Sequence, residues 1–272
     1  MGVNHLGYVV LREGDLVRAA ALQSQSLQMS RAIGSTWHSA WALSALGDVV
    51  FQQGNTQRAA TLLEESLALF RVLGDPHGTA SALQGLGEVA YSQGDLAQAE
   101  LLFEEGKHRF EKLGDTDGVA LALGNLAGVA LVQGDFKQAA ALYRESLTLR
   151  YQLNDKHGIA KCLEGLAGIA QARGYVERCV HLLSAAAGLR KQIIAQTPFT
   201  PPNGSRVREH ALEAARAQLG EQAFAVAWAG GQVLTAEQMV AIALNEPRIS
   251  AGGTPGAAAE MAADARWRGR RG

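Results

Sequence analysis

Few residues of this 272-residue sequence are spaced in a way that could support catalysis. His77 and His157 each follow an aspartate by two residues, Asp75 and Asp155, and such pairs could serve acid–base chemistry or bind a metal ion. Both pairs occupy the same position of a recurring pattern, which indicates a structural role at the surface near a helix start. Metal sites need clustered ligands, and neither an HExxH motif nor paired CxxC motifs are present, so we expect no metal ion.

The glycine-containing segments do not predict a nucleotide site. Gly106-Lys107 lacks the upstream glycine and the following serine or threonine of a phosphate-binding loop. The strings GNLAG and GLAG fall within helical patterns, where small residues favour close packing. We therefore expect no cofactor, no catalytic residue and no enzymatic activity. An enzyme with an unfamiliar active site is the competing hypothesis, and loss of turnover on substituting Glu88 would support it.

A period of 40 residues organises the chain. It is most visible in five glycines, four of which precede aspartate or asparagine: Gly14, Gly54, Gly94, Gly134 and Gly174. Each glycine ends one amphipathic helical pattern, and the polar residue after it can cap the next helix. A fixed period of this length is typical of stacked helical hairpins. The sequence thus predicts an all-α fold, a right-handed superhelical solenoid of about five hairpins.

Apolar residues keep their place in every unit, which indicates a continuous core. Three sets of equivalent positions show this: Leu43, Leu83, Leu123 and Leu163; Leu6, Leu46, Leu86, Leu126 and Leu166; Ala19, Ala59, Ala99, Ala139 and Cys179. Gly7, Gly47 and Gly87 share a further position, where a very small side chain lets two helices approach closely. Leu86 is expected to be buried, so that an aspartate there would unfold the array.

Composition excludes several other classes of protein. The formal net charge of −1 gives no general attraction to nucleic acid, and 47% apolar residues suffice for a core. Cys162 and Cys179 are expected to be reduced and buried, although the sequence does not show whether they are ever oxidised. The N-terminus has no signal-peptide pattern, and the apolar run from Val119 to Val132 is too short to span a bilayer. We expect a cytoplasmic protein without membrane contact.

The repeat resembles the tetratricopeptide family. The resemblance rests on small residues at positions 47 and 59, on Leu43 and Leu46, and on the bulky Leu63, Phe103 or Tyr143. More narrowly, LLEESLALFRVLGDPHGTASALQGLGEVAYSQGD is similar to the MalT-like superhelical region of bacterial LuxR-type signal-transduction ATPase regulators. That resemblance implies a sensor region that binds an effector or partner. The ATPase and helix-turn-helix domains of those regulators have no counterpart here.

We expect three segments. Residues 1–196 form the repeat array, with a truncated first unit; residues 197–245 add capping helices after a proline-rich loop; residues 246–272 form a disordered tail rich in alanine, glycine and arginine. At most, the arginines of this tail touch nucleic acid weakly. The N-terminal end lacks a polar cap, which predicts either a fragment of a larger regulator or an end that associates with itself or with a partner.

By the resemblance, the first helix of each hairpin lines a concave face that binds a partner protein, a peptide or a small effector. The exposed residues expected there mix aromatic, acidic and amide side chains: Trp41, Ser44, Asp48, Phe51, Gln84, Glu88, Tyr91, Asn125, Leu131, Lys161 and Glu164. The predicted function is that of a binding module, similar to the sensor region of a LuxR-type regulator. A stand-alone adaptor that joins two partners is the alternative. The identity of the ligand or partner and the oligomeric state stay open.

Overall fold

The computed structural model describes residues 6–7, 10–11, 15–196, 205–232 and 234–244. Most of these residues are α-helical, and no strand occurs among them. The expected loop at 197–204 and the expected tail at 246–272 lie outside the described residues. The elements are α2 (Leu16–Ala32), α3 (Thr36–Gln52), α4 (Thr56–Leu73), α5 (Pro76–Ser92), α6 (Leu96–Leu113), α7 (Thr116–Gln133), α8 (Phe136–Gln152), α9 (Lys156–Ala172), α10 (Val176–Gln196), α11 (Ser205–Leu219), α12 (Glu221–Gln232) and α13 (Ala236–Leu244).

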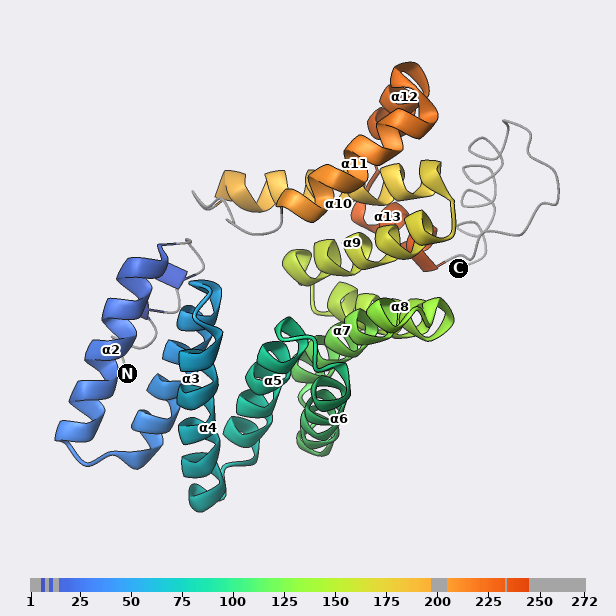
Figure 1. Cartoon of the computed structure of the whole chain (residues 1–272). Helices are drawn as coiled ribbons and strands as arrows, with labels where there is room; N and C mark the ends of the chain where they lie inside the picture. The colour runs from blue at the N-terminus through green and yellow to red at the C-terminus, as the bar shows by residue number, and fades with distance from the viewer. Residues whose placement is uncertain (1–5, 8–9, 12–14, 197–204, 233, 245–272) are drawn as a thin grey trace.

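The helices form a solenoid of antiparallel hairpins, as the 40-residue period predicts (Figure 1). The hairpins α3–α4, α5–α6, α7–α8 and α9–α10 follow one another, and α2 packs on α3. Helices α11 and α12 cover α10, while α13 lies against α8 and α10. The first helices α3, α5, α7 and α9 also contact one another in succession. Direct contact between first helices places them on the inner side of the superhelix.

The helix boundaries follow from local capping chemistry. Asn55 accepts a hydrogen bond from the Arg58 amide at 3.2 Å, and aspartates cap most other helices in the same way. The C-terminal glycines are left-handed, and Asn154, with φ of 54°, is the one other described residue with positive φ. At α13, Thr235 and Gln238 exchange backbone-to-side-chain hydrogen bonds of 2.9 and 3.2 Å. These two bonds form a capping box at the start of α13.

Close approach within each hairpin depends on the small residues of the first helix. A Cβ atom at Gly47 would lie 2.8 Å from the Leu63 side chain, and one at Gly87 would overlap the Phe103 ring. Leu63 and Phe103 are 1% exposed. Each large side chain thus fills the space that the missing methyl group leaves. The predicted reason for the small residue at this position is confirmed.

Helix α7 is the one helix of the described chain that is long and apolar enough to cross a membrane, with a mean hydropathy of 1.3 over Thr116–Gln133. The sequence-based prediction that this segment is too short to span a bilayer was made for the apolar run from Val119 to Val132, whereas the helix is longer at both ends. The helix packs against α6, α8 and α9, and Leu123 and Leu126 are 2% and 4% exposed. Its apolar composition is explained by contacts on several sides within the array.

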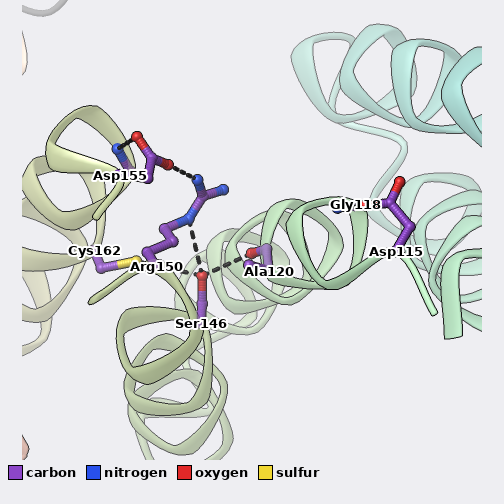
Figure 2. A network of polar contacts seen from close by, with 8 residues as sticks. Asp115, Gly118, Ala120, Ser146, Arg150, Asp155 and Cys162 are labelled. Atoms are coloured by element: carbon purple, nitrogen blue, oxygen red, sulfur yellow. Dashed lines mark hydrogen bonds and ion pairs between the residues drawn. The ribbon is translucent and has the colours of Figure 1, made fainter. Parts of the chain in front are cut away.

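A buried arginine in the hairpin α7–α8, Arg150, makes a network of polar contacts (Figure 2). Arg150 stands where Phe70 and Phe110 pack in the preceding units, and it is only 7% exposed. Its guanidinium donates to Asp155, the N-cap of α9, and its Nε donates to Ser146 Oγ at 3.3 Å. Ser146 Oγ in turn donates to the Ala120 carbonyl at 2.7 Å. The buried charge is therefore paired and hydrogen-bonded, as burial demands.

Most of the expected core is buried, with two exceptions: Leu6 is 45% exposed and Leu86 is half-buried. Leu43, Leu46, Leu126 and Leu166 are at most 4% exposed, whereas Leu86 is half-buried and packs at the edge of two apolar clusters. The expectation that Leu86 is buried was wrong, because its side chain packs at the edge of these two clusters rather than inside one of them. Leu83, at 1% exposed, is the better site for a disruptive charge.

Gly87→Ala is expected to lower the free energy of unfolding by about 1–2 kcal/mol, because overpacking against Phe103 outweighs the higher helix propensity of alanine. Gly188→Ala is the matched control. Its added Cβ meets no atom within 4 Å, so the variant gains up to about 1 kcal/mol. Urea unfolding followed by circular dichroism measures both. Equal effects of the two substitutions would contradict the assigned close approach.

Arg150→Ala is expected to destabilise the array by about 3 kcal/mol, since it removes a buried ion pair and leaves a cavity. Arg150→Phe restores the residue of the preceding units, and Gly158 leaves room for a ring as Gly118 does for Phe110. The phenylalanine variant should therefore lose less than half as much. Thermal unfolding of both variants checks the order, and a phenylalanine variant less stable than the alanine variant would show that the ion pair is essential.

Candidate functional site

Two carboxylates meet on the inner side of the superhelix, where α3 and α5 are neighbours. Asp48 and Glu88 occupy equivalent positions of successive units, and both are half-buried. The Asp48 carboxyl lies close to the backbone of α5, since a Cβ atom at Gly85 would be 3.5 Å from its Oδ1. Burial, followed by repulsion from Glu88, raises the pKa of Asp48 to about 8. Asp48 has no hydrogen bond or ion pair within the described part of the chain.

Glu88 is held by a relay of amide side chains. Burial raises the pKa of Glu88, while the Lys161 charge and a hydrogen bond with Asn125 oppose that shift. Asn125 Nδ2 also donates to Gln84 Oε1 at 3.2 Å, and Gln84 Nε2 donates to the Phe103 carbonyl at 3.2 Å. The relay connects the carboxylate to the backbone of α6 and fixes the orientation of both amides. Gln84 fits there because Gly106 leaves the space open.

Two tyrosine hydroxyls lie next to this relay, above a glycine. A Cβ atom at Gly128 would be 3.7 Å from the Tyr143 hydroxyl and 3.8 Å from the Tyr91 hydroxyl. Tyr143 is 9% exposed, yet its hydroxyl forms no hydrogen bond with any described residue. The hydroxyl oxygen itself is not fully enclosed, so it is accessible from the surface. Burial raises the pKa values of Tyr91 and Tyr143, so both hydroxyls stay protonated and can donate.

We name Asp48, Glu88, Tyr91, Asn125 and Tyr143 the inner-face cluster. Its members come from α3, α5, α7 and α8, and its two tyrosine hydroxyls lie next to the backbone of Gly128. It offers two carboxylates as acceptors and two hydroxyls as donors, and Lys161 of α9 is exposed beside it. This arrangement can bind a polar group and lets a backbone approach closely at the glycine.

An aromatic row extends the same face toward the start of the first helices. Trp37 Nε1 donates to Asp75 at 2.9 Å, and Trp41 contacts the rings of Phe70 and His77 at 4.9 and 5.7 Å between centroids. His77 continues the row to Phe110 and pairs with Asp115 at 3.1 Å. The His77 side chain is 52% exposed. A surface position near a helix start is therefore confirmed for His77, and no group that could hold a metal ion occurs among the described residues.

In the structure some of the predicted site residues lie close together, and others are buried. Ser44 and Gln84 were expected to be exposed, and this was wrong: they are 6% and 3% exposed, because neighbouring first helices cover them. Phe51 and Leu131 are half-buried at apolar clusters. The Glu164 carboxylate is paired with Arg190, whose Nε and Nη2 donate hydrogen bonds to it at 2.9 and 2.8 Å. Whether the remaining residues bind a partner stays a prediction.

Sequence analysis missed Tyr143 as a site residue. It was assigned to packing, because Leu63, Phe103 and Leu183 occupy the equivalent positions. The available signal was the hydroxyl itself, since Leu63, Phe103 and Leu183 are apolar and only Gln23 of the first unit is also polar at this position. Cys162 and Cys179 are buried as expected, and burial raises the pKa of both thiols, which keeps them unreactive.

A hollow of about 540 Å³ lies elsewhere, between α10 and the turn before α12. It is a wide and open depression that brings Glu177 and His181 next to Gly220 and Val226. Burial lowers the pKa of His181. These groups do not converge with further donors, so the inner-face cluster is the stronger candidate site.

Known family models match much of the chain. A tetratricopeptide-repeat family model matches residues 3–71 and 39–112, and a second tetratricopeptide-repeat model matches residues 122–156. Together they cover more than half of the chain, which therefore belongs to the tetratricopeptide-repeat family. No curated protein sequence matches the chain at a significant level.

Solved structures show the same fold. The crystal structure of BtubC (BKLC) from P. vanneervenii is similar with a TM-score of 0.56 and 19% identity, over 89% of this chain and 98% of that one. A crystal structure from Podosopora anserina, described as a kinesin light chain with nearly identical TPR-like repeats, has a TM-score of 0.50 and 15% identity, over 71% and 94%. At these identities the likeness concerns the fold alone.

The raised pKa of Asp48 predicts a loss of stability toward alkaline solution. The folded-state pKa lies above the unfolded value, so this contribution is fully present below about pH 4 and is lost as pH rises through about 8. The melting temperature should fall between about pH 5 and pH 8, and Asp48→Asn should flatten that decrease. Differential scanning calorimetry of both proteins checks it, and parallel pH profiles would contradict the shift.

Proposed function

We propose that the chain is a non-catalytic protein-interaction module that binds a peptide segment of a partner on its inner face. Tetratricopeptide repeats generally form protein-interaction scaffolds, and the fold of this chain is theirs. The observation that supports the location is the inner-face cluster, whose Asp48 carboxyl and Tyr143 hydroxyl lack partners in the described chain. Polar groups without partners at a surface site are available to a ligand.

The finer assignment concerns the protein to which the module belongs. We propose the sensor region of a LuxR-type bacterial regulator, in which a bound effector or partner changes the curvature or self-association of the array. This rests on the sequence resemblance alone. The stand-alone adaptor that joins two partners is equally compatible with the repeat fold. An in-frame ATPase-coding remnant upstream of the coding sequence would favour the regulator, and a promoter at Met1 would favour the adaptor.

The proposal also covers the location of the protein and its self-association. We place the protein in the cytoplasm, without membrane contact and with no more than weak nucleic-acid contact through residues 246–272. Self-association through the N-terminal end is supported by Leu6, which is 45% exposed, whereas the equivalent Leu46, Leu126 and Leu166 are 4% exposed. An exposed leucine at the end of a repeat array can be covered by a second copy.

Site-specific photo-crosslinking in the native cell tests the binding face. Tyr91 on α5 and Tyr151 on α8 are matched positions, 37% and 42% exposed. With a benzophenone amino acid in place of either tyrosine, we expect a discrete partner adduct from position 91 and none from position 151. Adducts from position 151 alone would overturn the proposed face.

An alanine substitution at Tyr91 tests how much this side chain contributes to the affinity for the partner. Tyr91→Ala should weaken capture of the crosslinked partner by roughly 10-fold, as aromatic anchors do in interfaces. Trp41 and Phe51 are less suitable because they also pack against the core. Unchanged melting temperature identifies the loss as one of binding rather than of folding, and unchanged capture would exclude Tyr91 from the interface.

A further inference from the structure

The charged groups of the inner-face cluster indicate the charge of its ligand, because the acidic groups outnumber the basic ones. Asp48 and Glu88 contribute two carboxylates, and Lys161 is the one cation of the described chain that shifts the pKa of either of them. The formal charges of these three groups therefore sum to −1 above about pH 8, where Asp48 is ionised as well as Glu88, and a bound cation favours that ionised form at lower pH. Lys161 acts on Glu88 and does not contribute to the pKa shift of Asp48. A second cation beside Asp48 would relieve the mutual repulsion of the two carboxylates.

Tyr143 supplies an independent observation. Its ring is packed against α9, since a Cβ atom at Gly165 would overlap it, and the residue is 9% exposed. The buried ring fixes the hydroxyl next to Gly128, where it finds no partner among the described residues. A hydroxyl held this rigidly can donate to a carbonyl group that approaches over the glycine.

We propose that the inner-face cluster binds a basic side chain of the partner peptide, with its ammonium or guanidinium group between Asp48 and Glu88 and a neighbouring peptide carbonyl accepting from Tyr143. This inference rests on the proposed peptide-binding function and adds the chemistry of the partner. Asn125, oriented by Gln84, positions Glu88 for the contact. The bare backbone of Gly128 lets the bound peptide approach the hydroxyl.

Two capped tripeptides test the proposal directly on the full chain: acetyl-Ala-Lys-Ala-amide and its norleucine counterpart, which has an aliphatic chain of similar length without the ammonium group. Ring signals of the five tyrosines report binding in NMR titrations. The lysine tripeptide should shift the signals of Tyr91 and Tyr143 saturably, with Kd on the order of millimolar, and leave Tyr151 unchanged. The norleucine tripeptide should shift none of them.

Variants identify the groups responsible. Asp48→Asn and Glu88→Gln should each weaken binding of the lysine tripeptide by about 10-fold or more, because each removes a charge-assisted contact. Tyr143→Phe should weaken it by about 2- to 10-fold, and this variant folds because Phe103 occupies the equivalent position. The controls Tyr151→Phe and Glu104→Gln, both on second helices, should bind as the unaltered chain does.

The outcomes separate this inference from the proposed function. Equal shifts with both tripeptides, or no shift with either, would overturn the basic-side-chain site, even where position 91 still crosslinks to a partner. Binding that the Asp48, Glu88 and Tyr143 variants leave unchanged would do the same. Conversely, selective lysine binding together with crosslinks only from position 151 would support the site while contradicting its use by the native partner.

Discussion

The close approach of two helices at Gly47 and Gly87 is the constraint on which the rest of the structure depends. Leu63 and Phe103 occupy the space above these glycines and are almost completely buried. This contact sets the distance between the two helices of a hairpin, and each hairpin buries its remaining apolar residues against its neighbours. The residues that make the contact recur 40 positions apart in the sequence. Glycine and asparagine residues with positive φ then end the helices at the same place in each unit.

The same packing creates the candidate site. When hairpins stack with their first helices in contact, equivalent positions of α3, α5, α7 and α9 come side by side. Asp48 and Glu88 meet for this reason, although 40 residues separate them in the sequence. Their half-buried position makes each charge costly and leaves Asp48 with a raised pKa. A polar site of this kind needs no insertion or irregular loop; it needs only that several repeats carry polar residues on their first helices.

The sequence predicted those features that depend on one helix or one repeat. Helix ends, caps and most core positions followed from the spacing of glycine, aspartate and leucine. The side-chain environments that depend on three helices could not be predicted. Gln84 is buried because Gly106 of α6 and Asn125 of α7 accommodate it, and Leu86 is only half-buried because it packs at the edge of two apolar clusters. The role of Tyr143 required the position of Gly128 on the adjacent helix.

A crystal structure of the chain bound to its crosslinked partner segment tests the central claim most directly. Our account predicts that the segment lies along the first helices, with a lysine or arginine side chain at Asp48 and Glu88 and its backbone over Gly128. A segment bound to the second helices α4, α6 and α8, or to the helices α11–α13, would contradict it.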